Sequence, residues 1–209
     1  MKPAKKSRRA EGPTYNRAAH LGPRGCTLMT TEGVMGATAI ALVPVEEYLR
    51  TSYEPDVDYV DGYLEDRHVG ENEHSNLQTE LATILRVNGR QWGIYAFVEH
   101  RVQVTAKRYR VPDVCVMPRS WKMTPIILEA PLLCIEVLSP EDTFSRTQVK
   151  CRDYLAMGVP EVWIFDPEQR TAFVMRGKTR TESRAGTLRL QGTEVQIDLA
   201  ELFAVLDEE

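Results

Sequence analysis

Two apolar runs in the middle of the chain dominate the pattern of hydrophobic and polar positions. Residues 109–117 are apolar along one alternating face, which predicts a strand inside a sheet. Residues 130–138 are apolar on both faces, which predicts a central strand that is covered on both sides. One carboxylate interrupts each run, Asp113 in the first and Glu136 in the second. The pattern therefore predicts an acid on each of two neighbouring strands.

Apolar residues at helical spacing predict two longer helices. The first covers residues 73–88 and ends at Gly89. Its expected buried stripe is Leu77, Leu81, Ile84 and Leu85. The second follows Ser139 and Pro140, and its expected stripe is Phe144, Cys151, Leu155 and Gly158. Lys150 flanks that stripe, so we expect its stem to lie on the sheet and its solvated ammonium group to reach the mouth of a site.

Shorter elements complete the predicted fold. Asp61 and Gly62 stand between two alternating runs, which predicts a tight hairpin, and Pro44 suits the first turn of a short helix. Further strands are expected at 94–100, 101–107, 162–165 and 171–175, with a hairpin around 185–186 and a strand and short helix over 195–203. This order indicates an α+β fold close to α/β, with a mixed central sheet flanked by helices and extra β-hairpins.

The chain of 209 residues with 43% apolar content is long enough for one sizeable core. Residues 1–38 have no apolar period, so we expect a disordered basic extension before a single domain over 39–209. The extension is a candidate nucleic-acid arm, or a segment upstream of a true start at Met29 or Met35. It carries seven Lys or Arg and two Asp or Glu, which leaves the remaining chain with 19 basic and 28 acidic residues. An acidic domain needs a local basic patch to bind a phosphate backbone.

The four cysteines show no C-x-x-C spacing, which favours small buried thiols over a disulfide or a zinc site. The sequence has neither a run of 18 apolar residues nor a signal peptide, so we expect a cytoplasmic protein without membrane contact.

Asp113 and Glu136 are costly to bury between apolar neighbours unless they are paired or bind a metal ion. A structural, hydrogen-bonded acid and a metal ligand are both compatible with the residues alone. Two such acids with Lys150 nearby can hold a hard divalent cation against a phosphodiester. The leading hypothesis from the residues is therefore a metal-dependent nuclease.

The order of several motifs carries a resemblance to a known family. The chain contains VPDV, then EVLSP, then a lysine and a tyrosine separated by three residues, then GVPEVWIFDP. Upstream, YVDGYLEDRHVGENEHSNLQ matches an opening hairpin and first helix. From about Val43 to about Phe203, the sequence resembles the Uma-type restriction endonuclease domains, a bacterial group in the PD-(D/E)XK nuclease superfamily. The resemblance implies a restriction-endonuclease-like core, a four- or five-stranded mixed sheet with a helix on each side.

The resemblance also implies site residues. Asp113 and Glu136 would hold Mg²⁺ or Mn²⁺, with the main-chain carbonyl of Val137 as a third ligand. The superfamily pattern has a lysine two residues after the second acid, where this chain has Leu138, and Lys150 on the following helix would replace it as a catalytic residue.

Further candidates surround this set. Arg146 stands where many relatives carry Asp, and its charge would help to hold a phosphate or mark altered chemistry. His74 is either a catalytic residue near the scissile phosphate or a half-buried structural histidine. The best candidate basic patch for nucleic acid is Arg101, Lys107, Arg108 and Arg110.

These expectations together predict a magnesium-dependent endonuclease that cleaves DNA as a homodimer. A duplex cut needs two sites, and small oligomers are mostly two-fold. The alternative is a catalytically inactive nuclease-fold module that binds nucleic acid or another partner.

Overall fold

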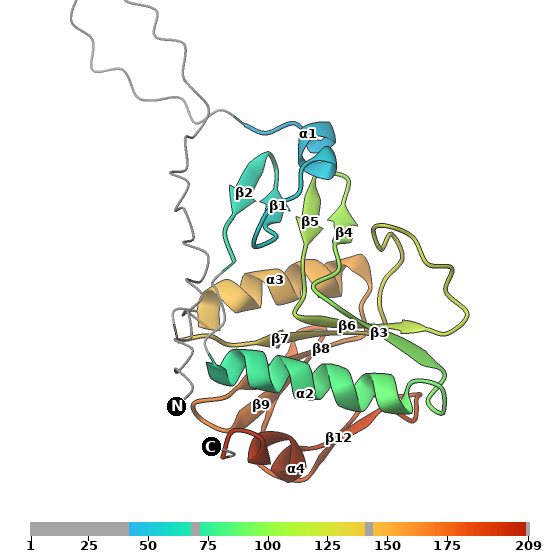
Figure 1. Cartoon of the computed structure of the whole chain (residues 1–209), viewed down its shortest axis with the longest axis vertical. Helices are drawn as coiled ribbons and strands as arrows, with labels where there is room; N and C mark the ends of the chain where they lie inside the picture. The colour runs from blue at the N-terminus through green and yellow to red at the C-terminus, as the bar shows by residue number, and fades with distance from the viewer. Residues whose placement is uncertain (1–41, 68–71, 141–143, 208–209) are drawn as a thin grey trace, which may run out of the picture. The chain divides into compact units, whose positions relative to one another are not determined.

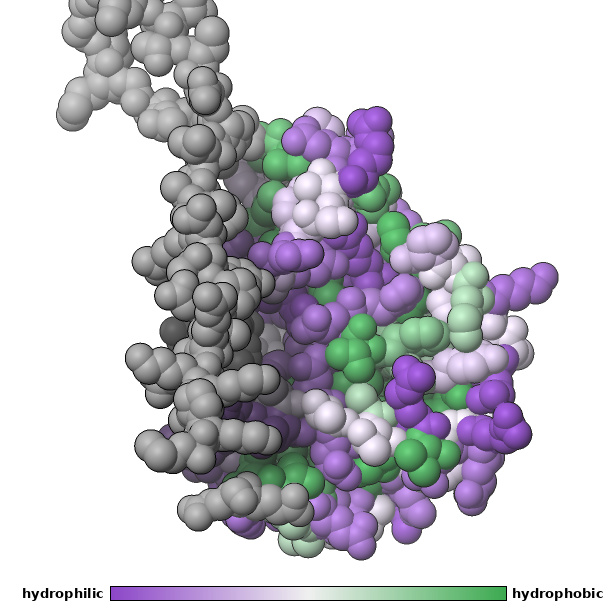
Figure 2. Space-filling view, in the orientation of Figure 1, coloured by the Kyte–Doolittle hydropathy of each residue, from purple (hydrophilic) through white to green (hydrophobic). Residues whose placement is uncertain are grey.

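The computed structural model describes residues 42–67, 72–140 and 144–207, all within the compact unit Ala41–Glu209. The extension predicted over 1–38 lies outside the described residues. No helix of the described segments is long and apolar enough to cross a membrane. Figure 2 shows mostly hydrophilic residues on the coloured part of one face, with hydrophobic residues in small separate groups.

A six-stranded mixed sheet forms the centre of the fold. Its strands, in spatial order, are β10 (Thr179–Ser183), β9 (Thr171–Arg176), β8 (Glu161–Asp166), β7 (Leu133–Val137), β6 (Val114–Pro118) and β3 (Ile94–Val98). The pair β7–β8 is parallel and the other pairs are antiparallel. The sheet is mixed, as predicted, and wider than the four or five strands expected.

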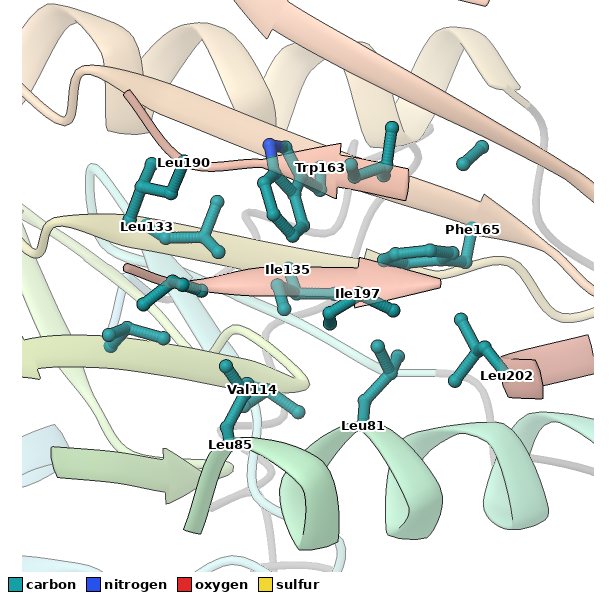
Figure 3. Close-up of a cluster of buried hydrophobic side chains, with 14 of the residues drawn as sticks. Leu81, Leu85, Val114, Leu133, Ile135, Trp163, Phe165, Leu190, Ile197 and Leu202 are labelled. Carbon is teal, nitrogen blue, oxygen red and sulfur yellow. The ribbon is translucent and has the colours of Figure 1, made fainter. Parts of the chain in front are cut away.

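Helices α2 (Asn72–Asn88) and α3 (Phe144–Met157) lie on opposite sides of this sheet (Figure 1). Leu81 and Leu85 of α2 point at Val114 and Ile135 of the sheet, and α4 (Leu199–Ala204) closes the same apolar cluster (Figure 3). The predicted α2 stripe is confirmed for the three leucines, which are fully buried, while Ile84 is partly buried. The α+β class with helices flanking a mixed sheet is therefore the fold.

Strand β7 is covered on both sides, as its sequence predicts. All five of its residues are buried. Leu133 and Ile135 belong to the cluster under α2, whereas Cys134 belongs to the cluster under α3. Cys115, Cys134 and Cys151 are buried free thiols in the α3 cluster, which confirms that expectation for three of the four cysteines.

A second, four-stranded sheet lies on the α3 side of the molecule together with α1 (Val45–Arg50), as Figure 1 shows. Its strands, in spatial order, are β2 (Tyr63–Glu65), β1 (Asp58–Val60), β5 (Arg108–Arg110) and β4 (Val102–Thr105). The predicted hairpin joins β1 and β2, with positive φ at both Asp61 and Gly62. Tyr48 stacks on Tyr59, and Tyr109 packs against both rings at an angle, which forms the small core of this part.

Two predictions about strands were wrong, one on the extent of a strand and one on a hairpin. The run 109–117 is not one strand, because β5 ends at Arg110 in the small sheet and β6 begins at Val114 in the central sheet. Pro112 lies in the break and has no N–H to donate to a strand ladder. The expected hairpin around 185–186 is also absent from the described residues, since β10 pairs with β9 and β11 (Thr187–Arg189) pairs with β12 (Gln196–Asp198).

Candidate active site

Asp113 and Glu136 lie next to each other on the α3 face of the central sheet. The register of β6 and β7 pairs Cys115 with Cys134 and Val114 with Ile135, so the next pair outward is Asp113 and Glu136. Directly opposed residues of an antiparallel pair place their side chains on the same face. Both acids alternate in phase with Cys115 and Cys134, which pack under α3. The expected neighbourhood of the two acids is therefore found with Glu136 on β7 and Asp113 one residue before β6.

Both carboxylates line one polar pocket with a volume of about 40 Å³. Because about 10–15 Å³ of such volume holds one water molecule, the pocket has room for a small hydrated ion. Its lining residues come from the small sheet, the central sheet and both long helices: Asp58, Asp66, Arg67, His74, Asp113, Glu136, Val137, Arg146, Thr147 and Lys150. The pocket therefore brings together the predicted residues Asp113, Glu136, Val137, Lys150, His74 and Arg146.

Asp113 is buried and has a donor at each of its two oxygens. Its Oδ1 accepts a hydrogen bond from Arg67 Nη2 at 2.6 Å, and its Oδ2 accepts one from the Val137 amide at 2.7 Å. His74 Nε2 lies 3.4 Å from the same Oδ2. Burial raises the pKa of Asp113, but the His74 hydrogen bond and the charges of Lys150 and Arg67 outweigh it and hold the pKa at about 2. Asp113 is therefore an anion at neutral pH.

Glu136 is equally buried but has fewer donors. Its Oε2 lies 2.7 Å from Lys150 Nζ, and its Oε1 accepts a hydrogen bond from Tyr154 at 2.7 Å. Burial raises the pKa of Glu136 to about 7, with Lys150 opposing and Asp113 adding to the rise. Burial therefore disfavours the charged form of Glu136 even though Lys150 and Tyr154 bind its oxygens.

Lys150 reaches Glu136 because α3 turns one stripe of side chains toward the sheet. Thr147, Cys151 and Tyr154 are buried at helical spacing, and Lys150 and Tyr154 follow each other at i and i+4. The prediction of a solvated ammonium group was wrong, because the Lys150 side chain is only 14% exposed. Burial lowers the pKa of Lys150, but Asp58 and Glu136 outweigh this and raise it overall.

Three further residues of the site were missed from the sequence. Asp58 is buried, lies 3.8 Å from Lys150 Nζ through Oδ2, and accepts a hydrogen bond from the Val111 amide at 2.8 Å. Its signal was an acid between the apolar residues Val57 and Tyr59. Tyr154 was marked by its four-residue spacing from the lysine. Arg67 follows β2 with no periodic signal that would have identified it.

His74 and Gln78 attach the first turns of α2 to Asp113. His74 is buried, lines the pocket and faces the Asp113 carboxylate. Gln78 Nε2 donates to the Asp113 main-chain carbonyl at 3.2 Å. The start of α2 therefore fixes both the backbone and the side chain of Asp113.

The predicted basic patch is not a free surface for a phosphate backbone. Arg110 is 1% exposed and binds Asp58, Glu65 and Asp153, so it is a structural residue of the interior and this prediction needs correction. Arg108 binds Asp61 and Asp153, and Arg101 binds Asp56 and lies over the Tyr48 ring. Lys107 is exposed in the turn between β4 and β5. The carboxylates that bind Arg101, Arg108 and Arg110 lie about forty or more positions away from them in the sequence, so the pattern of one strand does not reveal these ion pairs.

Arg146 occupies a different position from these residues. It lines the pocket from the first turn of α3 and donates to the main-chain carbonyl of Asp66 at 2.5 Å. It is the one residue of the predicted nucleic-acid set that lies among the lining residues of this pocket.

The donor set of the pocket fits a divalent cation. In the described parts of the chain, no group of three or more His, Cys, Asp or Glu side chains could hold a metal ion. An ion would instead rest on two carboxylates, the Val137 carbonyl and water, an arrangement that Mg²⁺ accepts. A carboxylate has about four lone-pair positions, of which Asp113 uses three and Glu136 two in the contacts above. Each acid therefore keeps a position for a cation, which would also balance their shared charge.

The family comparison covers most of the chain. Residues 45–204 match the model of the Uma2 family, described as "Putative restriction endonuclease". The chain belongs to the Uma2 family. It has no match among curated protein sequences.

Two solved structures resemble the fold to different degrees. A "putative nuclease belonging to DUF820" from Anabaena variabilis ATCC 29413 superposes with a TM-score of 0.69 at 24% identity, over 77% of this chain and 97% of that chain. This likeness supports the fold. A cryoEM structure of a DrdV–DNA complex gives a TM-score of 0.31 at 12% identity, over 65% of this chain and 14% of that chain, which is too low to support an argument.

Proposed function

We propose that this protein is an endonuclease that hydrolyses phosphodiester bonds in DNA and uses Mg²⁺ or Mn²⁺ as its cofactor. The observation that carries the proposal is that Asp113, Glu136 and Lys150 line one polar pocket. Membership of the Uma2 family supports the nuclease class.

Asp113 and Glu136 would hold the cation, with the Val137 carbonyl as a further oxygen ligand. A divalent ion at such a site lowers the pKa of bound water and neutralises charge on the transferring phosphate. Asp113 is suited to this role because His74, the Val137 amide and Gln78 fix its position. Ligands held by surrounding contacts keep a site in its reactive geometry.

Lys150 would stabilise the negative charge that develops on the phosphate in the transition state. It substitutes for the lysine that the superfamily pattern places at position 138, where Leu138 packs against the apolar cluster under α3. Nearby acids keep Lys150 protonated, so it can donate without changing its charge.

A non-catalytic binding module is the second candidate. The ion pairs of Asp113 with Arg67 and of Glu136 with Lys150 favour it, because paired carboxylates need no metal ion to remain buried. Metal-dependent cleavage separates the two functions.

Cleavage of supercoiled plasmid tests the proposal directly. The full chain, incubated with Mg²⁺ or Mn²⁺, should convert plasmid to nicked and linear forms, and EDTA should stop the reaction. Asp113→Asn should be inactive, whereas Arg86→Ala, an exposed residue of α2, should cut at the wild-type rate. Single-stranded DNA and RNA substrates measure the preference for DNA. Absence of cleavage of every substrate with either metal would support the binding module.

We also propose that a homodimer makes the duplex cut, because two strands require two sites and two-fold symmetry supplies them. Analytical ultracentrifugation with and without a DNA duplex tests this assembly. A monomer in both conditions that still produces linear plasmid in one binding event would contradict it.

A further inference from the structure

Arg67 occupies the oxygen of Asp113 that a cation would need. Asp113 Oδ2 already accepts the Val137 amide and faces His74, so Oδ1 is the less occupied oxygen. Arg67 Nη2 lies 2.6 Å from this Oδ1, and the Arg67 side chain is only 10% exposed. The guanidinium group is therefore the ion-pair partner of Asp113 at Oδ1.

A divalent ion bound to the remaining position of Asp113 would share Oδ1 with this guanidinium group. Two cations within a few ångströms of each other in a poorly solvated pocket repel strongly. Arginine stays protonated in proteins, so Arg67 cannot relieve the repulsion by losing its charge. Arg67 must then move away from Asp113 when the ion binds.

Glu99 gives Arg67 a fixed point for that movement. Arg67 Nη1 lies 3.3 Å from Glu99 Oε1, and the Glu99 amide donates to the Asp113 main-chain carbonyl at 3.2 Å. Glu99 is about half exposed, so the guanidinium group can keep this contact while its other nitrogen turns into the pocket. Arg146 and Lys150 line the same pocket.

We propose, on the basis of the proposed nuclease function, that Arg67 and the divalent cation exchange at Asp113, and that the displaced guanidinium group binds the scissile phosphate. The forked donors of arginine match phosphate oxygens, and a phosphodiester is the new anion that the substrate brings to the pocket. Arg67 thus balances Asp113 before metal binding and becomes a catalytic residue afterwards.

Calorimetric titration of the full chain with Mn²⁺ alone tests the exchange without any cleavage reaction. Arg67→Gln keeps a hydrogen-bond donor near Asp113 but removes the competing charge, so Mn²⁺ should bind about tenfold more tightly or better. Arg67→Lys keeps the charge and should bind Mn²⁺ within about threefold of wild type. Arg86→Ala, the control variant at an exposed residue of α2, should leave the affinity for Mn²⁺ unchanged. Unchanged or weaker binding by a folded Arg67→Gln protein would overturn the exchange.

Plasmid cleavage at saturating Mn²⁺ tests the phosphate contact. Arg67→Gln should lower kcat/KM by about tenfold or more despite its tighter metal binding, because a charged phosphate contact is lost. Wild-type kcat/KM in this variant would overturn the phosphate role of Arg67. Mn²⁺ binding by wild type without any effect of Arg67→Gln would overturn the exchange and leave the proposed function in place. Failure of both proteins to bind Mn²⁺ would overturn the proposed function and the exchange together.

If Arg67→Gln does not fold, Arg67→Met replaces it in both measurements with the same expected results. Circular dichroism of each variant establishes that the compared proteins are folded.

Discussion

Lys150 Nζ on α3 lies 2.7 Å from Glu136 Oε2 on β7. The two residues are 14 positions apart, and α3 packs back over β7, in which Glu136 is the next-to-last residue. Tyr154, one helical turn after Lys150, donates to the other oxygen of Glu136. One face of one helix therefore orients the second acid of the site and supplies its neighbouring cation.

The Lys150–Glu136 pair gives the first prediction. Lys150→Met should lower the rate of DNA cleavage at saturating metal by about 10² or more, because one preorganised charge in the site is lost. It should also lower the free energy of unfolding by about 3 kcal/mol above pH 7, where Glu136 is ionised, since the charged Glu136 is left buried without its partner. Urea unfolding and plasmid cleavage measure the two effects. Lys150→Arg should recover part of the activity, as the charge is kept while the geometry changes.

The double variant Glu136→Gln/Lys150→Met is the control for this loss of stability. Glu136→Gln combined with Lys150→Met should be less destabilised than Lys150→Met alone, because no buried charge is left unpaired. Wild-type cleavage by Lys150→Met alongside an inactive Asp113→Asn would remove Lys150 from the mechanism and direct attention to Arg146.

Glu136 gives a prediction on pH. Its pKa is raised from 4.5 to about 7, mainly by burial, so the folded state holds a proton that the unfolded state releases between these values. Because the folded protein binds more protons than the unfolded chain in this window, the free energy of unfolding falls as the pH rises, by about 3 kcal/mol in total for this group. Glu136→Gln should flatten the curve of unfolding free energy between pH 4.5 and 7 in EDTA. Equal slopes for the two proteins would contradict the raised pKa.

Asp113 should act at the opposite end of the pH scale. Its pKa is lowered from 3.8 to about 2, so its contribution is present above about pH 4 and is lost as the pH falls toward 2. The free energy of unfolding should therefore drop less between pH 4 and pH 2 in Asp113→Asn than in the wild-type protein. Acid unfolding of the two proteins measures this difference.

Arg110 should prove structural. It lies among Asp58, Glu65 and Asp153 in the interior, so Arg110→Met removes the buried cation that these three carboxylates share and should cost about 3–5 kcal/mol of stability. Lys107→Ala, in the exposed turn nearby, should change stability by less than about 0.5 kcal/mol. Thermal unfolding compares the two. A stable Arg110→Met protein with weakened DNA binding would instead return Arg110 to the nucleic-acid surface.

Much of the fold could be predicted because its signals are local. The apolar residues of β7 and α2 mark their own burial, and Asp61-Gly62 marks its own turn. The separation of β5 from β6 could not be predicted in this way, because the pattern of 109–117 is continuous and only long-range pairing assigns its halves to two sheets.

The residues of the site also divide into those that the sequence revealed and those that it did not. Asp113 and Glu136 were recognisable because a carboxylate is exceptional in an apolar strand, and the family resemblance marked Lys150. Asp58 and Arg67 come from the chain around the small sheet, and tertiary packing alone places them beside acids of the central sheet. The same packing neutralises Arg101, Arg108 and Arg110, which sequence alone presented as a free basic patch.

The central claim is that Asp113 and Glu136 share one divalent cation. A crystal structure of the full chain with Mn²⁺, with anomalous diffraction data collected at the manganese absorption edge, tests it most directly. We expect one strong anomalous peak within direct bonding distance of an oxygen of each carboxylate, and no peak there in crystals of Asp113→Asn. Wild-type crystals that keep the Arg67–Asp113 and Lys150–Glu136 ion pairs at saturating Mn²⁺, with no anomalous peak between the acids, would contradict it.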